Sequence, residues 1–406
     1  MVSRCGGLLG LVFVLIALIP WTSCGSSSQP PHPMVTSVMW VATQGDQMIR
    51  SFTINQENGQ IFPVGLTGSP VPTGAQPSEM VLAPDGHTLF LVNTGGTITT
   101  YAVNSSGALS PAGSPVNAGQ IPVALAVDPT GKFLFVANQG TLADPTSGTI
   151  SVFSISGTSL TQVPGSPFST QVAGEVSGSG PSAVAVSPLG SYLYVANQFA
   201  NTVQSYSFDS SGVLTMIATD AAGTGPSGLA FSRCAGITAD RATGTCPVAD
   251  GDNLFVANTG SNNISIFSAC IQVSGTCSAP NGTLAPIASG SPVAAGSGPA
   301  TIVVNPDQNF VYAVNRGSNQ VSEYKYVPAT GALTFLTNGS GGTSVFSGGI
   351  TANVSNTANL FNWVVLTNNG GSSLSIFRVA AASGELIALT TGQYTVQGQP
   401  SAILLK

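Results

Sequence analysis

The fold of this chain is decided by the stretch PSAVAVSPLGSYLYVAN at residues 181–197, which two more strand-like runs follow at 202–208 and 213–217. The small residues Ala183 and Ala185 suit a strand that is crowded by its neighbours. A Pro-x-Gly turn then reverses the chain. The run that ends the stretch is almost continuously apolar, as in strands packed on both faces. The stretch therefore predicts four short antiparallel strands.

The same order of features recurs along the chain. Further copies run over 77–93, 122–138, 226–258 and 299–315, and a weaker copy runs over 349–368. Repeats of about 45 to 60 residues with four strands each are typical of propeller blades. The hydrophobic fraction of 43% is that of a folded protein, and after residue 35 Gly, Pro or Asn interrupts every helical pattern before it reaches three turns. The sequence therefore predicts an all-β fold.

The two ends of the repeat region complement each other. Ser37–Thr43 matches a second strand that has no first strand before it, whereas 399–405 matches a first strand that has no second strand after it. Joining them completes a seventh blade and removes the unpaired edges of an open ring. We therefore predict one seven-bladed β-propeller over residues 35–406, closed by its C-terminal strand.

The first 34 residues predict an export signal. Arg4 precedes an apolar run over 8–19, which is too short to span a bilayer comfortably. Small residues then lead to Cys24, and a Ser- and Pro-rich stretch follows. This pattern resembles a bacterial lipoprotein signal, with 1–23 as the signal peptide, lipid attached at Cys24 and 24–34 as a flexible tether.

The export signal predicts where the protein is found, and the net charge of the exported chain excludes one class of partner. We expect a lipoprotein of the periplasm or cell surface, anchored by its lipid alone; Gly25 after the cysteine favours an outer membrane. Ordinary secretion is the alternative, because Trp21 replaces the usual aliphatic residue. Removal of Arg4 with the leader leaves eight basic and fifteen acidic residues, a net charge of −7, so nucleic acid is a poor partner.

Four cysteines remain in the propeller region, and all fall within one repeat. In an exported chain they predict two disulfides. Of the three connectivities, the local pairs Cys234 with Cys246 and Cys270 with Cys277 are favoured. Zinc is the alternative, but no Cys-x-x-Cys pair and no nearby histidine supports it. We expect no metal site and no cofactor.

Residues present in every blade of a propeller are usually structural. An asparagine ends the second strand of six repeats, and we interpret these residues as hydrogen-bonding braces rather than a ring around a ligand: Asn93, Asn138, Asn197, Asn258, Asn315 and Asn368. Three aspartates, Asp85, Asp128 and Asp307, stand in or beside turns and are interpreted as turn formers.

Two charged residues break the repeat and are the candidate ligand-binding residues. Glu79 stands near the start of a first strand, where we align Val123, Ala183, Gly228, Ala300 and Ala402 from other blades. Arg316 follows the repeated asparagine, where other blades have Gln139, Gln198 and Thr259. A guanidinium there could grip a carboxylate or phosphate with two hydrogen bonds. The alternative is an internal ion pair or simple solvation.

The repeated Leu-Tyr-Val-Ala-Asn strands, the Pro-Asp-Gly turn and Gly-x-Leu before the outermost strand resemble the Tyr-Val-Thr-Asn repeat and lactonase-type propellers. The stretch Val-Tyr-Ala-Val-Asn-Arg-Gly at 311–317 is similar to the Asn-Arg-Gly stretch of the lactonase family. The resemblance implies a seven-bladed ring with Arg316 at its channel mouth. Ser318 stands where that family tends to place a histidine.

Three function classes follow. The first is a non-catalytic module that binds a protein, a glycan or a small anionic ligand. The alternative, implied by the resemblance, is a lactonase-like hydrolase of the 6-phosphogluconolactonase type, acting on a sugar or organic-acid lactone, with Glu79 and Arg316 meeting across the channel mouth. The third is a structural surface role. The only histidines, His32 and His87, are too poorly placed for a Ser-His-Asp arrangement.

Overall fold

The computed structural model describes most of the region after residue 35. The described residues are 36–55, 57–64, 69–144, 146–171, 178–232, 253–273, 277–287, 290–305, 310–328, 330–340, 350–353 and 363–405. Val35–Lys406 forms one compact unit. Within the described ranges, no helix is long and apolar enough to cross a membrane. The predicted signal peptide and tether lie outside the described ranges, as do Cys24, Cys234, Cys246 and Asp307.

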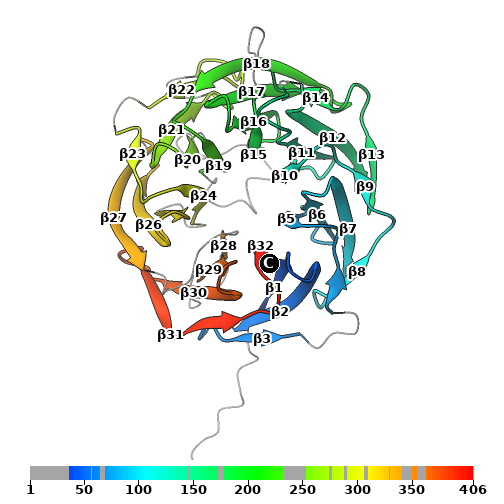
Figure 1. Cartoon of the computed structure of the whole chain (residues 1–406). Coiled ribbons are helices and arrows are strands. Elements are labelled where there is room, and N and C mark those ends of the chain that lie inside the picture. Colours follow the sequence, from blue (N-terminus) through cyan, green and yellow to red (C-terminus); the bar gives the residue numbers. More distant parts are fainter. Residues whose placement is uncertain are drawn as a thin grey trace, which may run out of the picture. The chain divides into compact units, whose positions relative to one another are not determined.

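The strands form seven antiparallel sheets around one axis, as predicted (Figure 1). In each sheet, or blade, the strands follow one another from the axis outward. Blade 1 consists of β32 (Pro400–Leu405), β1 (Thr36–Thr43), β2 (Met48–Asn55) and β3 (Ile61–Pro63), with β4 (Val71–Pro72) beside β2. Blade 2 consists of β5 (Pro77–Leu82), β6 (Thr88–Asn93), β7 (Thr97–Val103) and β8 (Leu109–Pro111), with β9 (Val116–Asn117) beside β7. Blade 3 consists of β10 (Pro122–Val127), β11 (Phe133–Asn138), β12 (Thr149–Ser156) and β13 (Ser159–Gln162), with β14 (Phe168–Ser169) beside β12.

The other four blades repeat this order. Blade 4 consists of β15 (Pro181–Val186), β16 (Tyr192–Asn197), β17 (Thr202–Phe208) and β18 (Leu214–Ala221). Blade 5 consists of β19 (Pro226–Phe231), β20 (Asn253–Asn258), β21 (Asn263–Ala269) and β22 (Leu284–Pro286), with β23 (Val293–Ala294) beside β21. Blade 6 consists of β24 (Pro299–Val304), β25 (Phe310–Asn315), β26 (Gln320–Val327) and β27 (Ala332–Ser340). Blade 7 consists of β28 (Ile350–Asn353), β29 (Trp363–Asn368), β30 (Ser373–Val379) and β31 (Leu386–Thr395).

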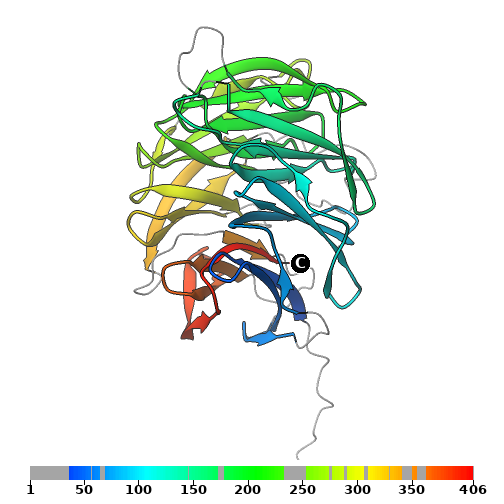
Figure 2. The same cartoon turned by 45° about the vertical axis from the view of Figure 1, so that its right-hand side comes forward.

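The C-terminal strand closes the ring, as the sequence predicts. The red strand β32 lies beside the blue strand β1 (Figure 2), and the two pair antiparallel with Val41 opposite Ile403. Ile403 packs in the core shared with blade 7, whereas Ala402 packs in the core shared with blade 2. The last strand therefore completes blade 1 and links it to both neighbours.

The side chains of the second strands form much of the core between the blades. All six residues of β6, β11, β20, β25 and β29 are buried. Successive residues of one strand face different neighbours: Phe135 packs with Leu193 of blade 4, and Leu134 packs with Phe90 of blade 2. Each such side chain contributes about 1.5–3 kcal/mol when fully buried. Packing on both faces explains why these strands are almost continuously apolar in sequence.

Serine hydroxyls join the first strands of neighbouring blades. The second residue of the first strand is serine in blades 1, 2, 4 and 5, and each hydroxyl donates to a backbone carbonyl of the next blade. The bonds run from Ser401 to Pro77 (2.6 Å), from Ser78 to Val123 (3.2 Å), from Ser182 to Pro226 (2.7 Å) and from Ser227 to Pro299 (3.1 Å). The innermost strands are thus held in a fixed order around the axis.

One of the two predicted disulfides lies within the described ranges. Cys270 and Cys277 are bonded and brace the loop between β21 and β22 in blade 5. This confirms one local pair. The pair of Cys234 with Cys246 stays a prediction.

Candidate functional site

The start of each first strand and the end of each second strand lie at the same end of the ring. Pro77 pairs opposite Asn93, Pro299 opposite Asn315, and Pro400 opposite Thr43. We call this end the mouth. The residue that directly follows each second strand belongs to what we call the mouth ring: Gln44, Thr94, Gln139, Gln198, Thr259, Arg316 and Asn369. The ring is polar throughout and carries one charge.

Hydrogen bonds link members of the mouth ring to neighbouring blades. Gln139 Nε2 donates to Gln198 Oε1 at 2.9 Å, which joins blades 3 and 4. Asn369 Nδ2 lies 3.5 Å from Gln44 Oε1, and Gln44 Nε2 donates to the Pro77 carbonyl at 3.3 Å. These bonds hold a set of amide groups in place around the axis, and amides can both donate to and accept from a ligand.

Arg316 is the one exposed member of the mouth ring; the other six side chains are half-buried. Its backbone N–H donates to the Gly298 carbonyl at 2.8 Å, which fixes the position of the residue. Its guanidinium forms no hydrogen bond or ion pair with any residue in the described ranges. Arg316 can therefore bind an anion without first losing an internal partner.

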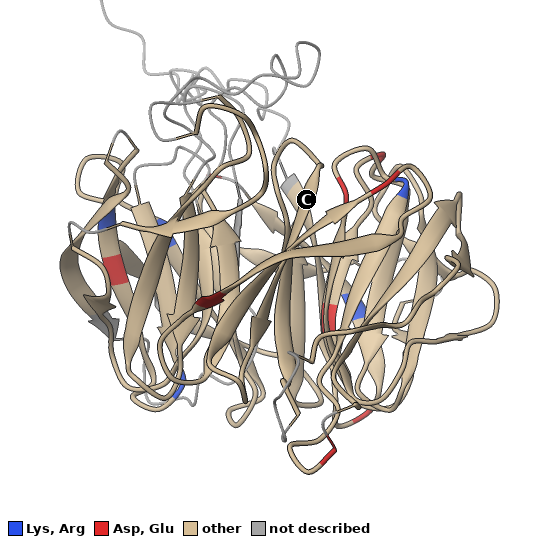
Figure 3. Cartoon of the chain, turned by 90° about the horizontal axis from the view of Figure 1, so that it is seen from above, with Lys and Arg blue, Asp and Glu red and all other residues tan. Residues whose placement is uncertain are grey.

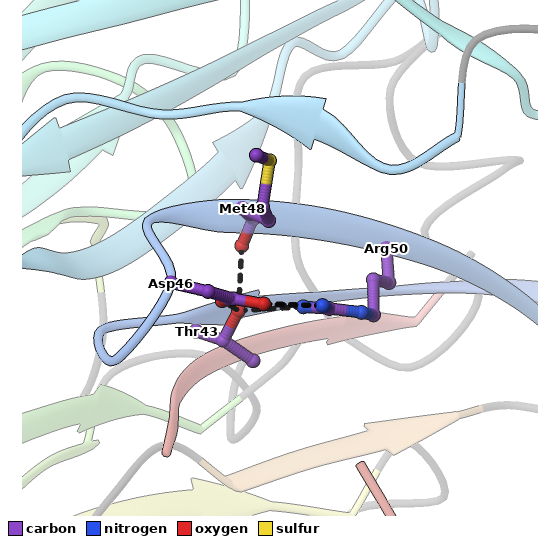
Figure 4. Close-up of polar contacts among 4 residues, drawn as sticks. All are labelled: Thr43, Asp46, Met48 and Arg50. Atoms are coloured by element: carbon purple, nitrogen blue, oxygen red, sulfur yellow. Dashed lines mark hydrogen bonds and ion pairs between the residues drawn. The ribbon is translucent and has the colours of Figure 1, made fainter. Parts of the chain in front are cut away.

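A second cation near the mouth, Arg50, is already occupied. Arg50 forms an ion pair with Asp46 in the β1–β2 hairpin, and its Nη1 also donates to Thr43 Oγ1 at 2.8 Å (Figure 4). Burial alone would raise the pKa of Asp46, but hydrogen bonds from Arg50 and Thr43, with the charge of Arg50, hold it below its usual value. Seen from above, charged residues are sparse on the ring (Figure 3). Arg316 thus stands out as an unpaired cation.

Glu79 lies in the gap between blades 2 and 3. Its Oε2 accepts a hydrogen bond from the backbone N–H of Leu125 at 3.0 Å. The side chain is exposed, and because β6 covers one edge of its strand and β10 and β32 flank it, the open side faces the axis. Protein atoms of the ring nevertheless surround the carboxylate on its other sides, and this partial loss of hydration raises the pKa of Glu79 to about 7, although the Leu125 N–H lowers it in part.

The strand register corrects two positions in the predicted alignment with Glu79. Its equivalents in blades 3 and 6 are Ala124 and Thr301, not Val123 and Ala300. The error arises because Val123 and Ala300 replace the serine that marks the second position of the first strand in blades 1, 2, 4 and 5. The correction leaves Glu79 as the one charged residue among the aligned positions.

Glu79 and Arg316 stand on blades 2 and 6, as predicted, and at the same end of the ring. No ion pair joins them, and neither residue pairs with any other charged side chain in the described ranges. Within the described residues, the structure therefore shows no internal ion pair for either side chain. A ligand that contacts both residues would have to lie across the mouth, between blades 2 and 6.

The repeated asparagines are braces, as predicted. All six are fully buried, and each donates from Nδ2 to a hydroxyl of the third strand in the same blade; the bond from Asn197 to Thr202 is the longest, at 3.4 Å, and the other five are shorter. These five bonds are Asn93 to Thr99 (3.0 Å), Asn138 to Ser151 (2.9 Å), Asn258 to Ser265 (2.9 Å), Asn315 to Ser322 (2.8 Å) and Asn368 to Ser375 (2.9 Å). Burial and bonding within the blade favour the structural role over a ring around a ligand.

The turn aspartates also have the structural role predicted for them. Asp85 accepts from the His87 N–H at 2.8 Å, and Asp128 accepts from the Phe133 N–H at 2.6 Å. Both lie in turns between the first and second strands, at the end of the ring opposite the mouth. They take no part in the candidate site.

One buried carboxylate, that of Glu323, was not predicted from the sequence. Glu323 on β26 is only 1% exposed, and its Oε2 accepts from the backbone N–H of Leu386 in blade 7 at 3.0 Å. A carboxylate that alternates with the aromatic residues of the stretch Val-Ser-Glu-Tyr-Lys-Tyr at 321–326 was the available signal. Glu323 joins blades 6 and 7 and is not a mouth residue.

A hollow of about 150 Å³ lies beside the disulfide on the outer side of blade 5. It is lined by Ser268, Cys270, Cys277, Ser278, Ala279, Asn281, Thr283 and Ala285. None of these carries a charge, and all belong to β21, β22 and the loop between them. The mouth, where the unpaired Arg316 and the axis-facing Glu79 are found, is therefore the better candidate site.

The chain is similar to one known protein family and to several solved structures. A family model described as "Lactonase, 7-bladed beta-propeller" matches residues 36–164, 146–269 and 247–403. The periplasmic gluconolactonase of Pseudomonas aeruginosa is 22% identical with a TM-score of 0.70, covering 91% of this chain and 99% of that protein. A Bacteroides fragilis protein described as a candidate 6-phosphogluconolactonase is 19% identical with a TM-score of 0.68, covering 91% and 98%. No curated protein matches the sequence significantly. At these identities, the structural likeness concerns the fold.

Proposed function

Since the chain belongs to the lactonase family of seven-bladed β-propellers, we propose that it hydrolyses a sugar or organic-acid lactone at the mouth. The observation that carries this proposal is an unpaired, exposed Arg316 in a ring of amides and hydroxyls, at the same end as a carboxyl group with a pKa of about 7. The gluconolactonase named among the structural neighbours agrees in fold and supports the same reaction class.

The chemistry assigns a role to each residue. Lactone hydrolysis adds water to the ring carbonyl and breaks the bond between that carbon and the ring oxygen, which yields a hydroxy acid. Glu79 as general base takes a proton from the attacking water, and the same proton can pass to the leaving ring oxygen. Arg316 stabilises the negative charge that develops on the carbonyl oxygen and then binds the product carboxylate. The reaction needs no cofactor.

The pH dependence of turnover tests the role of Glu79. A general base works in its ionised form, so kcat/KM for D-glucono-1,5-lactone should rise with pH through about 7 and level off above it. Glu79→Gln keeps an acceptor for the Leu125 N–H but cannot take a proton, so we expect a roughly 100-fold or greater loss of kcat/KM. Proton release, corrected for spontaneous hydrolysis, measures both. An unchanged rise in Glu79→Gln would show that another group is the base.

Ligand binding without catalysis is the second candidate. The observation in its favour is the makeup of the mouth ring: six of its seven members are uncharged amides or hydroxyls, which suit a glycan or other polyol. Saturable binding of sugar ligands, with no lactone turnover by the wild-type protein, would favour this function over hydrolysis. A small anionic ligand would bind Arg316 in either case.

We further propose that the protein is exported and anchored by a lipid on Cys24, in the periplasm or at the cell surface. The apolar run over 8–19 and the small residues before Cys24 support this. Cys24→Ala should move the protein from the membrane fraction to the soluble fraction of the cell envelope, because the acyl chains supply the anchor. Membrane retention of Cys24→Ala, measured by fractionation and immunoblot, would contradict the anchor.

A further inference from the structure

Left-handed backbone at residues other than glycine is found at seven positions in the described ranges. Five of them share one place, the end of the hairpin turn before the third strand: Gln47, Asn201, Asn262, Asn319 and Ser372. Because the left-handed conformation recurs at the same place in five hairpins, it is a property of this turn, and asparagine tolerates it well. These five therefore need no functional explanation.

The other two, Gln76 (φ 56°) and Ile121 (φ 53°), precede the prolines that open the first strands of blades 2 and 3. Blades 4, 5 and 6 have glycine there, namely Gly180, Gly225 and Gly298, each with positive φ. The positions are equivalent in hydrogen bonding: the Thr94 N–H donates to the Gln76 carbonyl at 3.0 Å, as the Gln198 N–H donates to that of Gly180 at 2.7 Å.

Glycine adopts this conformation freely, whereas glutamine does not, and a β-branched residue such as Ile121 is the least suited of all. The three glycine blades show that the fold itself does not require a side chain at this position. Residues held in unfavourable backbone regions tend to cluster at functional sites. Both of these border one gap, the one between blades 2 and 3.

That gap is the one that contains Glu79. From the mouth inward, Gln76 and Ile121 come first, and the Ser78 hydroxyl then donates to the Val123 carbonyl at 3.2 Å. Glu79, bonded to the Leu125 N–H, lies one residue deeper.

The equivalent gap, between blades 5 and 6, has no room for a side chain at the position of Glu79. A Cβ on Gly228, the equivalent of Glu79, would lie 2.8 Å from the Ala300 carbonyl oxygen of blade 6. The gap between blades 2 and 3, by contrast, admits a whole glutamate side chain.

The two residues offer complementary contacts. Gln76 Oε1 accepts from the Thr94 hydroxyl at 2.9 Å, which orients the exposed amide and leaves its NH₂ group as a donor. Ile121 is half-buried and presents aliphatic surface beside it. One hydrogen-bond donor next to one apolar patch suits a ring with hydroxyls on its edge and C–H groups on its face.

We propose that Gln76 and Ile121 form a substrate subsite with Glu79 between blades 2 and 3, which binds the ring of a polyhydroxylated lactone. Gln76 donates to a ring hydroxyl, and Ile121 packs against the C–H face. This inference rests on the proposed lactonase function. Gln76 is a specificity-determining residue whose effect should depend on the hydroxyls of the substrate, whereas Ile121 should contribute to binding of any six-membered lactone ring.

The test compares D-glucono-1,5-lactone with δ-valerolactone, which has the same six-membered ring but no hydroxyls. Gln76→Gly should lower kcat/KM about 10-fold for the hydroxylated lactone and leave that for δ-valerolactone almost unchanged, because one hydrogen bond to a hydroxyl is lost. Ile121→Gly should lower kcat/KM about 10-fold for both, because both rings have C–H faces. Neither change should lower the melting temperature by more than a few degrees, since glycine suits this backbone.

Gln47→Gly is the matched control, because Gln47 is also exposed and has the same φ of 56°, but lies in the β1–β2 turn. It should leave both kcat/KM values unchanged. Gln76→Asn is a second variant that tolerates left-handed backbone but shortens the reach of the amide, and it should show the same substrate-dependent loss. Wild-type kinetics in Gln76→Gly and Ile121→Gly would overturn the subsite alone. Failure of the wild-type protein to hydrolyse either lactone would overturn the proposed function, and the subsite with it.

Discussion

Deletion of residues 399–406 is expected to unfold most of the propeller, although it removes only eight of 406 residues. The deletion removes β32, exposes an edge of β1, and takes Ile403 and Ala402 out of the cores shared with blades 7 and 2. A buried isoleucine or leucine contributes about 1.5–3 kcal/mol, so the combined loss is comparable to the 5–15 kcal/mol that stabilises a typical domain. We expect the melting temperature to fall by at least about 10 °C.

Thermal unfolding followed by circular dichroism measures this effect. Two controls separate the strand from the chain end: Ile403→Ala should give a partial loss of about 2–5 kcal/mol, and a synthetic peptide of residues 398–406, added to the truncated protein, should restore part of the melting temperature. A truncated protein that melts like the wild type would show that the ring does not depend on its last strand.

Replacement of Arg316 by alanine is expected to have the largest effect on activity. A donor aimed at a developing oxyanion is worth about 100- to 1000-fold in kcat, and Arg316 is the mouth-ring member that carries a charge. Arg316→Lys should recover only part of this, because an ammonium group cannot bind a carboxylate with two parallel hydrogen bonds. Steady-state kinetics on D-glucono-1,5-lactone measures both variants.

Lys325→Ala is the control for charge. Lys325 is an exposed cation in the same blade, opposite Phe310 in the strand register and thus toward the other end of the ring. Its removal should leave kcat/KM unchanged. An equal loss in Lys325→Ala and Arg316→Ala would mean that the net charge, and not a bound substrate at Arg316, sets the rate.

The ring could be predicted from the sequence because most blades carry the same markers. A proline opens the first strand in six blades and an asparagine ends the second strand in six, so the copies can be aligned without a structure. The unpaired halves at 37–43 and 399–405 then imply the closure that the pairing of β1 with β32 confirms. Exact register could not be predicted, because Val123 and Ala300 replace the serine that marks the second position in other blades.

The candidate site could be predicted only in part. Arg316 and Glu79 were found because a charge breaks an uncharged pattern. Gln76 and Ile121 were not, because glycine signals left-handed backbone in a sequence, whereas other residues in the same conformation give no signal. The polarity of the mouth ring also became evident only when the seven hairpins were brought to one end of the molecule.

A crystal structure with bound D-gluconate, the product of hydrolysis, tests the central claim most directly. We expect the carboxylate at the Arg316 guanidinium, with the hydroxylated chain directed toward Glu79 and the gap between blades 2 and 3. Gluconate bound at the opposite end of the ring, or in the hollow beside Cys270 and Cys277 with the mouth left empty, would contradict it.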